Sequence, residues 1–154
     1  KTNGVILGES IRFNTTLARL SKVCEKGVIN TDLEVHLADE MTKEMGTKTP
    51  SNEQKIGNLS GGNQQKALLG KWMFTEPDIL ILDEVLSVGD AKFRKKSEKK
   101  VLSMFDKGVT VLFVSHSLEQ VQRLCNKAMI LEKGKLIAYG DIDEISAKYA
   151  EMIR

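Results

Sequence analysis

The chain has 154 residues, of which 41% are hydrophobic and 29% charged, and this composition is typical of a folded globular domain rather than a collagen-like, linker or disordered chain. No apolar run approaches the ~20 residues of a membrane-spanning helix, and the net charge of +2 is too small to indicate nucleic acid or an anionic membrane as a partner. Cys24 and Cys125 stand far apart without a second pair, which excludes a zinc knuckle and a disulfide scaffold and suits a reducing compartment.

The front of the chain is predicted to contain two helices after a short extended entry. The first spans about residues 14–26, because Asn14 is a good N-cap and a glycine follows the last residue. The second begins at Thr31, where Glu34 follows at the spacing of a capping box, and it ends near Gly46.

A third helix is expected after a loop over residues 47–58. It begins after Ser60 and carries apolar side chains at i,i+4 spacing. We therefore expect residues 1–76 to form a helical subdomain and residues 77–154 to form an α/β core portion.

From Pro77 onward the pattern changes to alternating strands and helices, the pattern of an α/β fold. Residues 78–82 read DILIL, and the continuous apolar run that follows the Asp predicts a strand buried on both faces. The elements expected after it are a basic helix capped by Asp90, a buried strand over 109–114, a helix opened by Ser117 with Gln120 in capping-box position, a hairpin about Lys133 and Gly134, and a helix over 141–154.

Polar side chains follow the two predicted core strands directly. Asp83 and Glu84 follow the first strand, and Ser115 and His116 follow the second. Strands of a βαβ unit are parallel, so their carboxyl ends share one edge, where open α/β sheets bind ligands. The sequence thus predicts two carboxylates and an imidazole at one edge.

An apolar strand that ends in Asp-Glu has the Walker B arrangement. The carboxylate of Asp83 is an oxygen ligand suited to Mg²⁺ through water, and Glu84 can polarise an attacking water molecule. An acidic pair after a strand is also a common solvated turn, and the pair alone does not decide between these interpretations.

The segment from Leu59 to Gln65 reads LSGGNQQ. A serine N-cap followed by two glycines leaves helix amides uncovered at the positive end of the dipole, and this geometry accepts a phosphate. By itself, Ser-Gly-Gly is more often a turn that leads into a helix.

The ordered series LSGGNQQK, helix, ILILDE, helix and a strand ending in Ser-His resembles the ATP-binding cassette (ABC) ATPases over nearly the whole chain. The resemblance implies a P-loop NTPase-like α/β cassette, here with a helical signature subdomain, a βαβ portion and a hairpin. It implies ATP and Mg²⁺ as cofactors, a second ABC cassette in a dimer and transmembrane permease subunits as partners, and a cytoplasmic location at the inner face of the membrane.

The resemblance also implies a role for each matching residue. These are Ser60, Gly61, Gly62, Asn63 and Gln64 for ATP held by the opposite cassette, Asp83 for Mg²⁺ through water, Glu84 as general base, Asp90 in the D-loop, and His116 as the switch histidine.

Three departures from the family pattern stand out. Asn63 replaces a commoner Gln, Val85 replaces the usual Pro, and no G-x-x-x-x-G-K-[ST] loop occurs. Without that loop there is neither a backbone nest nor a lysine for the β- and γ-phosphates, so we expect the chain alone to bind ATP poorly. We expect it to be the later portion of a longer ATPase.

The two halves resemble different relatives within this family. The front half resembles the second cassette of monosaccharide importers, whereas the back half resembles cassettes that export polysaccharide or teichoic-acid chains. We hypothesise a recombined or artificially joined cassette, with the change between residues 76 and 85; one divergent family is the alternative. Source DNA that is continuous across residues 72–90 would exclude artificial joining.

Three functions are compared. The first is transport-coupled ATP hydrolysis, for carbohydrate or polysaccharide, by the complete cassette. The second is a non-hydrolysing module that supplies the signature motif in trans. The third, a chromosome-maintenance ATPase, would need long heptad segments that the sequence lacks. In the basic run over 92–100 the aromatic residue Phe93 shares helical spacing with Ser97, Val101 and Met104, so the run predicts a solvated helix face rather than nucleic-acid binding.

Overall fold

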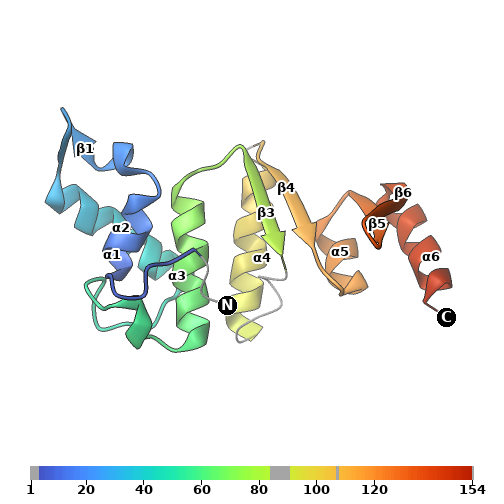
Figure 1. Cartoon of the computed structure of the whole chain (residues 1–154), viewed down its shortest axis with the longest axis horizontal. Helices are drawn as coiled ribbons and strands as arrows, with labels where there is room; N and C mark the ends of the chain where they lie inside the picture. The colour runs from blue at the N-terminus through green and yellow to red at the C-terminus, as the bar shows by residue number, and fades with distance from the viewer. Residues whose placement is uncertain (1–3, 84–90, 107, 154) are drawn as a thin grey trace. The chain divides into compact units, whose positions relative to one another are not determined.

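The computed structural model describes residues 4–83, 91–106 and 108–153 (Figure 1). In chain order the elements are α1 (Ile11–Leu17), β1 (Cys24–Glu25), β2 (Val28–Ile29), α2 (Thr31–Met45), α3 (Gly61–Phe74), β3 (Ile79–Asp83), α4 (Ala91–Phe105), β4 (Thr110–Val114), α5 (Leu118–Leu124), β5 (Lys127–Glu132), β6 (Lys135–Asp141) and α6 (Ile142–Met152). Short 3-10 turns lie at Leu20–Lys22 and Ile56–Asn58. In the described part of the chain, every helix is too short or too polar to cross a membrane.

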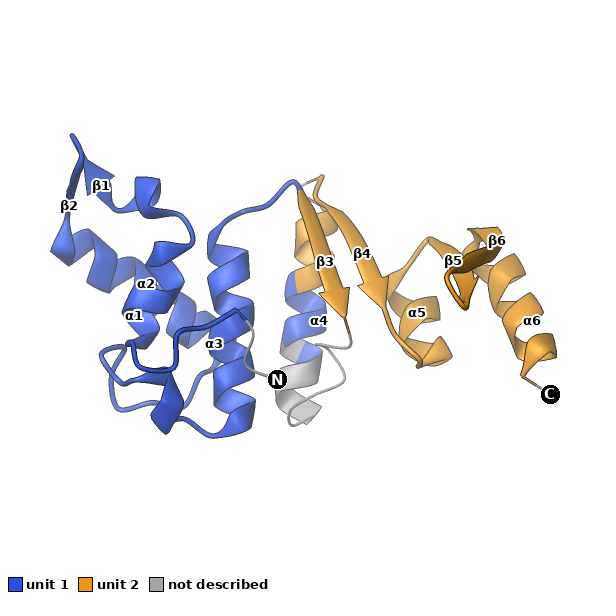
Figure 2. Ribbon diagram, in the orientation of Figure 1, with its two compact units in different colours: residues 1–78, 86–100 blue, residues 79–85, 101–154 orange. Residues whose placement is uncertain are grey.

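The chain divides into two compact units (Figure 2). Unit 1 comprises residues 1–78 and 86–100, and unit 2 comprises residues 79–85 and 101–154. Helices α1, α2 and α3 therefore belong to unit 1, and the paired strands β3–β4 and β5–β6 belong to unit 2.

The prediction of one helix over residues 14–26 is wrong. Helix α1 starts earlier and is capped by Ser10, whose hydroxyl accepts the Phe13 N–H at 3.1 Å. Asn14 lies inside this helix and is buried, and its side chain bonds the backbone of Ile6. The chain leaves the helix at Arg19, where φ is −152°. The rest of the predicted helix forms the 3-10 turn and the β1–β2 hairpin.

Helix α2 begins and ends close to the predicted positions, and α3 begins after Ser60 as predicted, although the predicted cap of α2 is wrong. The cap is Asn30, whose side chain accepts the Leu33 N–H at 3.1 Å, and Glu34 is buried and bonded elsewhere. Gly46 ends α2 in the left-handed region at φ 63°, as the sequence indicates. The local sequence signals therefore predict where α2 begins and ends, but not which residue caps it.

Helices α2 and α3 approach each other closely at Gly70. A Cβ at this position would lie 3.0 Å from Cγ of Met45 and 3.1 Å from Cγ of Met41. We expect Gly70→Leu to lower the free energy of unfolding of unit 1 by about 1–3 kcal/mol through overpacking. Urea unfolding followed by the fluorescence of Trp72, the only tryptophan of the chain, measures it. Gly61→Ala is the control because a Cβ there meets nothing within 4 Å; equal midpoints for the two variants would contradict the prediction.

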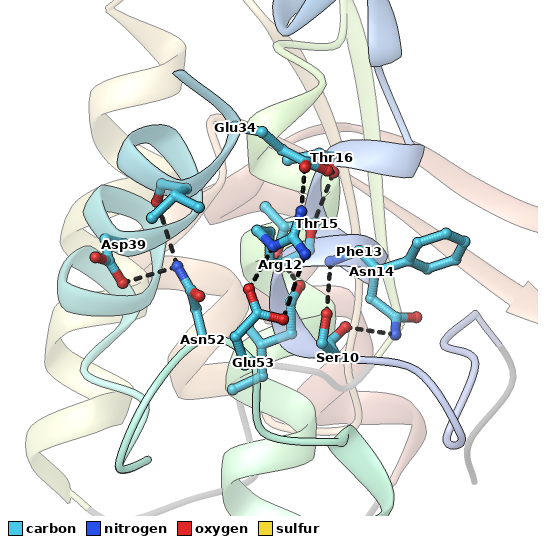
Figure 3. A network of polar contacts seen from close by, with 12 residues as sticks. Ser10, Arg12, Phe13, Asn14, Thr15, Thr16, Glu34, Asp39, Asn52 and Glu53 are labelled. Atoms are coloured by element: carbon cyan, nitrogen blue, oxygen red, sulfur yellow. Dashed lines mark hydrogen bonds and ion pairs between the residues drawn. The ribbon is translucent and has the colours of Figure 1, made fainter. Parts of the chain in front are cut away.

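A network of polar side chains ties α1 to α2 and to the loop after α2 (Figure 3). The guanidinium of Arg12 pairs with Glu34 and donates to Glu53 from Nε at 2.5 Å. The hydroxyl of Thr16 donates to Glu34 at 2.7 Å, and the Nδ2 of Asn52 donates to Asp39 at 2.8 Å. The buried carboxylate of Glu34 is thereby satisfied from two positions of α1.

In unit 2, strands β3 and β4 are parallel, as predicted, and both arrows in Figure 2 point the same way. Two burial predictions are wrong for this chain: the first of these strands is not buried on both faces, and no residue of the second, β4, is buried. Leu80 and Leu82 are buried, whereas Ile79 is 61% exposed and Ile81 is 66% exposed. The apolar run indicates that both faces of β3 favour burial. In the described part of the chain, other residues pack against only one of these faces.

Strands β5 and β6 form the predicted hairpin. Lys133 and Gly134 connect them, both with positive φ (48° and 78°), which is the geometry of a two-residue hairpin turn. Helix α6 follows and buries Ile145, and Ile130 of β5 is buried as well. The final helix confirms the prediction for the end of the chain.

Candidate functional site

The first turn of α3 presents open backbone amides. The helix begins at Gly61 after Ser60, as the sequence predicts, and the Ser60 side chain accepts no hydrogen bond from the amides of this turn. A Cβ placed on Gly61 or Gly62 would meet nothing within 4 Å, so the backbone there is approachable. The turn contains no acidic side chain, and the helix dipole makes it electropositive. This helix end can accept an anion such as a phosphate.

Two amide side chains hold the start of α3 in place. Asn63 donates from Nδ2 to the Ser60 Oγ at 3.1 Å, and its Oδ1 accepts the backbone N–H of Lys48 at 3.0 Å. Gln64 donates from Nε2 to the carbonyl of Leu59 at 3.1 Å. Of the predicted nucleotide-binding residues in this segment, Asn63 and Gln64 thus bond other parts of unit 1.

A hydrogen bond from α3 to the end of α2 also holds the first turn of α3 in place. Lys66 of α3 is 8% exposed and donates from Nζ to the carbonyl of Gly46 at 3.3 Å. That carbonyl lies at the C-terminal end of α2, where a positive charge is favourable. A buried ammonium therefore fastens α3 to the segment that carries Lys48.

The second predicted group of residues lies in unit 2, at the carboxyl ends of β3 and β4. Asp83 is the exposed last residue of β3 and pairs in register with Val114, the last residue of β4. His116 follows two positions after Val114, so parallel pairing brings Asp83 and His116 to one edge of the sheet, as predicted. The described residues contain no group of three or more His, Cys, Asp or Glu side chains that could together bind a metal ion.

The turn that carries His116 is held by hydrogen bonds on both of its sides. The Ser115 hydroxyl accepts the Ser117 N–H at 3.1 Å and donates to the Gln120 side chain at 3.3 Å. Ser117 caps α5 as predicted, accepting the Gln120 N–H at 3.5 Å. The exposed His116 side chain is therefore carried by a turn whose backbone is fixed.

Glu84, Val85 and Asp90 lie outside the described residues, so the predicted general base and D-loop residue have no structural account. The signature residues belong to unit 1, whereas Asp83 and His116 belong to unit 2.

Sequence reasoning missed the contributions of Lys48 and Lys66. A local signal near Lys48 was Gly46, which ends α2 in the left-handed region two residues before it. The i,i+3 spacing of Ser60 and Asn63 was also visible. No local pattern indicates that these two segments meet.

Comparison with known proteins shows which family the chain resembles in sequence. A sequence profile described as ABC transporter matches residues 7–87. The chain is 35% identical over all of its 154 residues to the L-arabinose transport ATP-binding protein AraG of Geobacillus stearothermophilus, covering 30% of that relative. It is 37% identical over 136 residues (88% of the chain) to the xylose import ATP-binding protein XylG of Geobacillus kaustophilus, covering 27% of it. The chain thus spans under a third of the length of the curated relatives it matches.

A solved structure shares the fold. The ATP-binding cassette MJ0796, in a dimeric post-hydrolysis state bound to ADP and Pi, superposes with a TM-score of 0.78 at 20% sequence identity. The match covers 92% of this chain and 60% of that one. The predicted α/β fold of an ATP-binding cassette, related to the P-loop NTPases, is confirmed.

Proposed function

Because the chain belongs to the ABC transporter family, we propose that it forms the signature-to-switch part of the ATP-binding protein of a sugar importer. In this proposal the open end of α3 binds the γ-phosphate of ATP held by a second cassette. The observation that carries the proposal is the first turn of α3, where the Ser60 side chain caps none of the amides and two glycines leave the backbone approachable.

Each residue of the proposed site has a chemical task. Ser60 and the amides of Gly61 and Gly62 would donate hydrogen bonds to phosphate oxygens. Asp83 fits Mg²⁺, because this ion takes one or two carboxylates and keeps several waters, and Asp83 is exposed. Bound Mg²⁺ would neutralise phosphate charge. Glu84 would accept a proton from the attacking water, and His116 would orient that water.

The substrate and partners are proposed from the relatives. Their names give L-arabinose transport, xylose import and ribose import, so we propose a sugar as cargo and import as direction rather than polysaccharide export. A second cassette and membrane permease subunits would be the partners, with Asp90 in the loop that crosses between cassettes. The protein would act at the inner face of the membrane. The joined-cassette hypothesis stays a prediction, although the AraG match runs through both halves.

A second candidate is a module that completes another cassette's ATP site without hydrolysing ATP at its own. The sequence favours it in one respect, since no G-x-x-x-x-G-K-[ST] loop occurs in the 154 residues. Both candidates share the contribution of α3 in trans, and they differ in whether Asp83, Glu84 and His116 ever act.

A mixing experiment tests the shared contribution. The partner is a complete cassette from a sugar import ATP-binding protein, with an intact phosphate loop and with its own signature serine replaced, so that it hydrolyses ATP slowly. We expect addition of this chain to raise the rate of phosphate release by about 10⁴-fold, because it supplies the Ser60 hydroxyl and two backbone amides, and a single preorganised donor at a developing charge already contributes about 10²-fold or more. An unchanged rate at saturating chain concentration would overturn the proposal.

A further inference from the structure

We infer that Asn63 is a positioning residue, which holds the Ser60 hydroxyl away from its own helix and aims it at the phosphate. This inference rests on the proposed function. It differs from the role that the family resemblance implies for Asn63, which is direct contact with ATP. The geometry points instead to a relay from Lys48 through Asn63 to Ser60.

The first step is what Ser60 does not do. A serine at an N-cap normally accepts the N–H of the second or third residue of the helix, and this bond stabilises the helix. Ser60 has the extended backbone of an N-cap, with φ −60° and ψ 153°, yet its side chain makes no such bond. The amides of Gly62 and Asn63 are therefore left without a side-chain cap.

The second step is what replaces the cap. The Asn63 side chain, on the third residue of the helix, donates from Nδ2 to the Ser60 Oγ at 3.1 Å. The hydroxyl oxygen is thus used as an acceptor, and its proton is left to be donated. A hydroxyl held in this way can donate a hydrogen bond to an anionic oxygen.

The third step fixes the orientation of the Asn63 amide group. Its Oδ1 accepts the Lys48 N–H at 3.0 Å, which leaves the Nδ2 to face Ser60. Lys48 is placed by the end of α2, where Gly46 turns at φ 63° and its carbonyl accepts the Nζ of Lys66. Gly46 at the end of α2 thus helps to place Lys48, whose N–H orients the Asn63 amide group that bonds Ser60, the N-cap of α3.

A double-mutant cycle in the mixing experiment tests the relay. We expect Asn63→Ala to lower the rate about tenfold, the loss of roughly one hydrogen bond, and Ser60→Ala to lower it about a hundredfold. If Asn63 acts through Ser60, the double variant is no slower than Ser60→Ala alone, within about twofold. Asn58→Ala, an exposed asparagine in the preceding turn, is the control. Multiplied effects in the double variant, about a thousandfold, would overturn the inference.

Amide hydrogen exchange in the chain alone gives an independent reading. In Asn63→Ala the freed Ser60 hydroxyl can take the capping position, so exchange of the amides at 62 and 63 should slow by about fivefold. Lys48→Pro removes the N–H donor and should change exchange in the same direction, whereas Lys48→Ala keeps that N–H and should not. Unchanged or faster exchange in Asn63→Ala would overturn the relay. If Ser60→Ala itself left the mixed rate unchanged, the proposed function would fail instead, and the exchange result would still decide the relay.

Discussion

Ser60→Ala is expected to lower ATP hydrolysis in the mixed cassettes by about 10²-fold while leaving the fold of unit 1 intact. The first effect follows because a preorganised donor aimed at developing phosphate charge is lost. The second follows because the Ser60 side chain caps no amide of α3, so the usual loss of about 1 kcal/mol for a missing N-cap does not apply. Steady-state phosphate release and urea unfolding, followed by Trp72 fluorescence, measure the two effects.

Ser51→Ala is the matched control for this substitution. Ser51 is an exposed serine in the loop before α3, and its backbone carbonyl, rather than its side chain, accepts hydrogen bonds from Thr49 and Gln54. We expect its rate and unfolding midpoint to match those of the unmodified chain. Equal rates for Ser60→Ala and Ser51→Ala would mean that the serine hydroxyl makes no contribution to the reaction.

Glu34→Ala is expected to lower the free energy of unfolding of unit 1 by about 3 kcal/mol. The Glu34 side chain is 7% exposed and accepts hydrogen bonds from Arg12 and Thr16, so its removal leaves the Arg12 guanidinium short of one partner in a partly buried site. Breaking a buried ion pair by removing one member costs about 3–5 kcal/mol, and the partial exposure of Arg12 places this case at the lower end. The urea midpoint reported by Trp72 measures the change.

Glu53→Ala separates burial from charge. Glu53 pairs with the same guanidinium, but its side chain is 56% exposed, so its loss should cost about 0–1 kcal/mol. Equal losses for the two glutamates would contradict the role given to burial.

A change of pH around neutrality should not alter the contribution of Arg12 to the free energy of unfolding of unit 1. The hydrogen bond to Glu53 is the main cause that raises the pKa of Arg12, desolvation opposes it, and the Glu34 charge adds to it. A raised pKa means that this contribution is complete below the ordinary arginine range and is lost only as the pH rises through the folded-state pKa, far above neutrality.

Local signals in the sequence were enough for much of the fold. The start of α3 after Ser60, the cap of α5 at Ser117 and the hairpin turn at Lys133 and Gly134 depend on residues within a few positions of one another. The helix predicted over 14–26 is wrong because Asn14 lies inside α1, where its side chain bonds Ile6 instead of capping a helix, and because the chain leaves the helix at Arg19. The prediction that β3 is buried on both faces is wrong because burial of a strand face depends on other elements that pack against it, and the strand's own sequence does not show which elements are present.

In the candidate site, too, features that depend on neighbouring residues could be predicted, and contacts between distant segments could not. The order of motifs predicts Ser60, Asp83 and His116 as site residues, and the parallel pairing of β3 with β4 brings the last two to one edge. The bond from Lys48 to Asn63 joins residues 15 positions apart, across the end of one helix and the start of another. Such a contact depends on how α2 and α3 pack, for which neither helix carries a local signal.

The most direct test of the account is the equilibrium affinity for ATP, measured by titration for this chain alone, for the partner cassette alone and for their mixture. We predict that the chain alone does not saturate below millimolar ATP, because its sequence has no phosphate-cradling loop, and that the mixture binds ATP at least tenfold more tightly than the partner cassette alone. Ser60→Ala should abolish that gain. Micromolar binding by the chain alone, or a mixture no tighter than the partner cassette, would contradict the claim that α3 completes an ATP site held by another cassette.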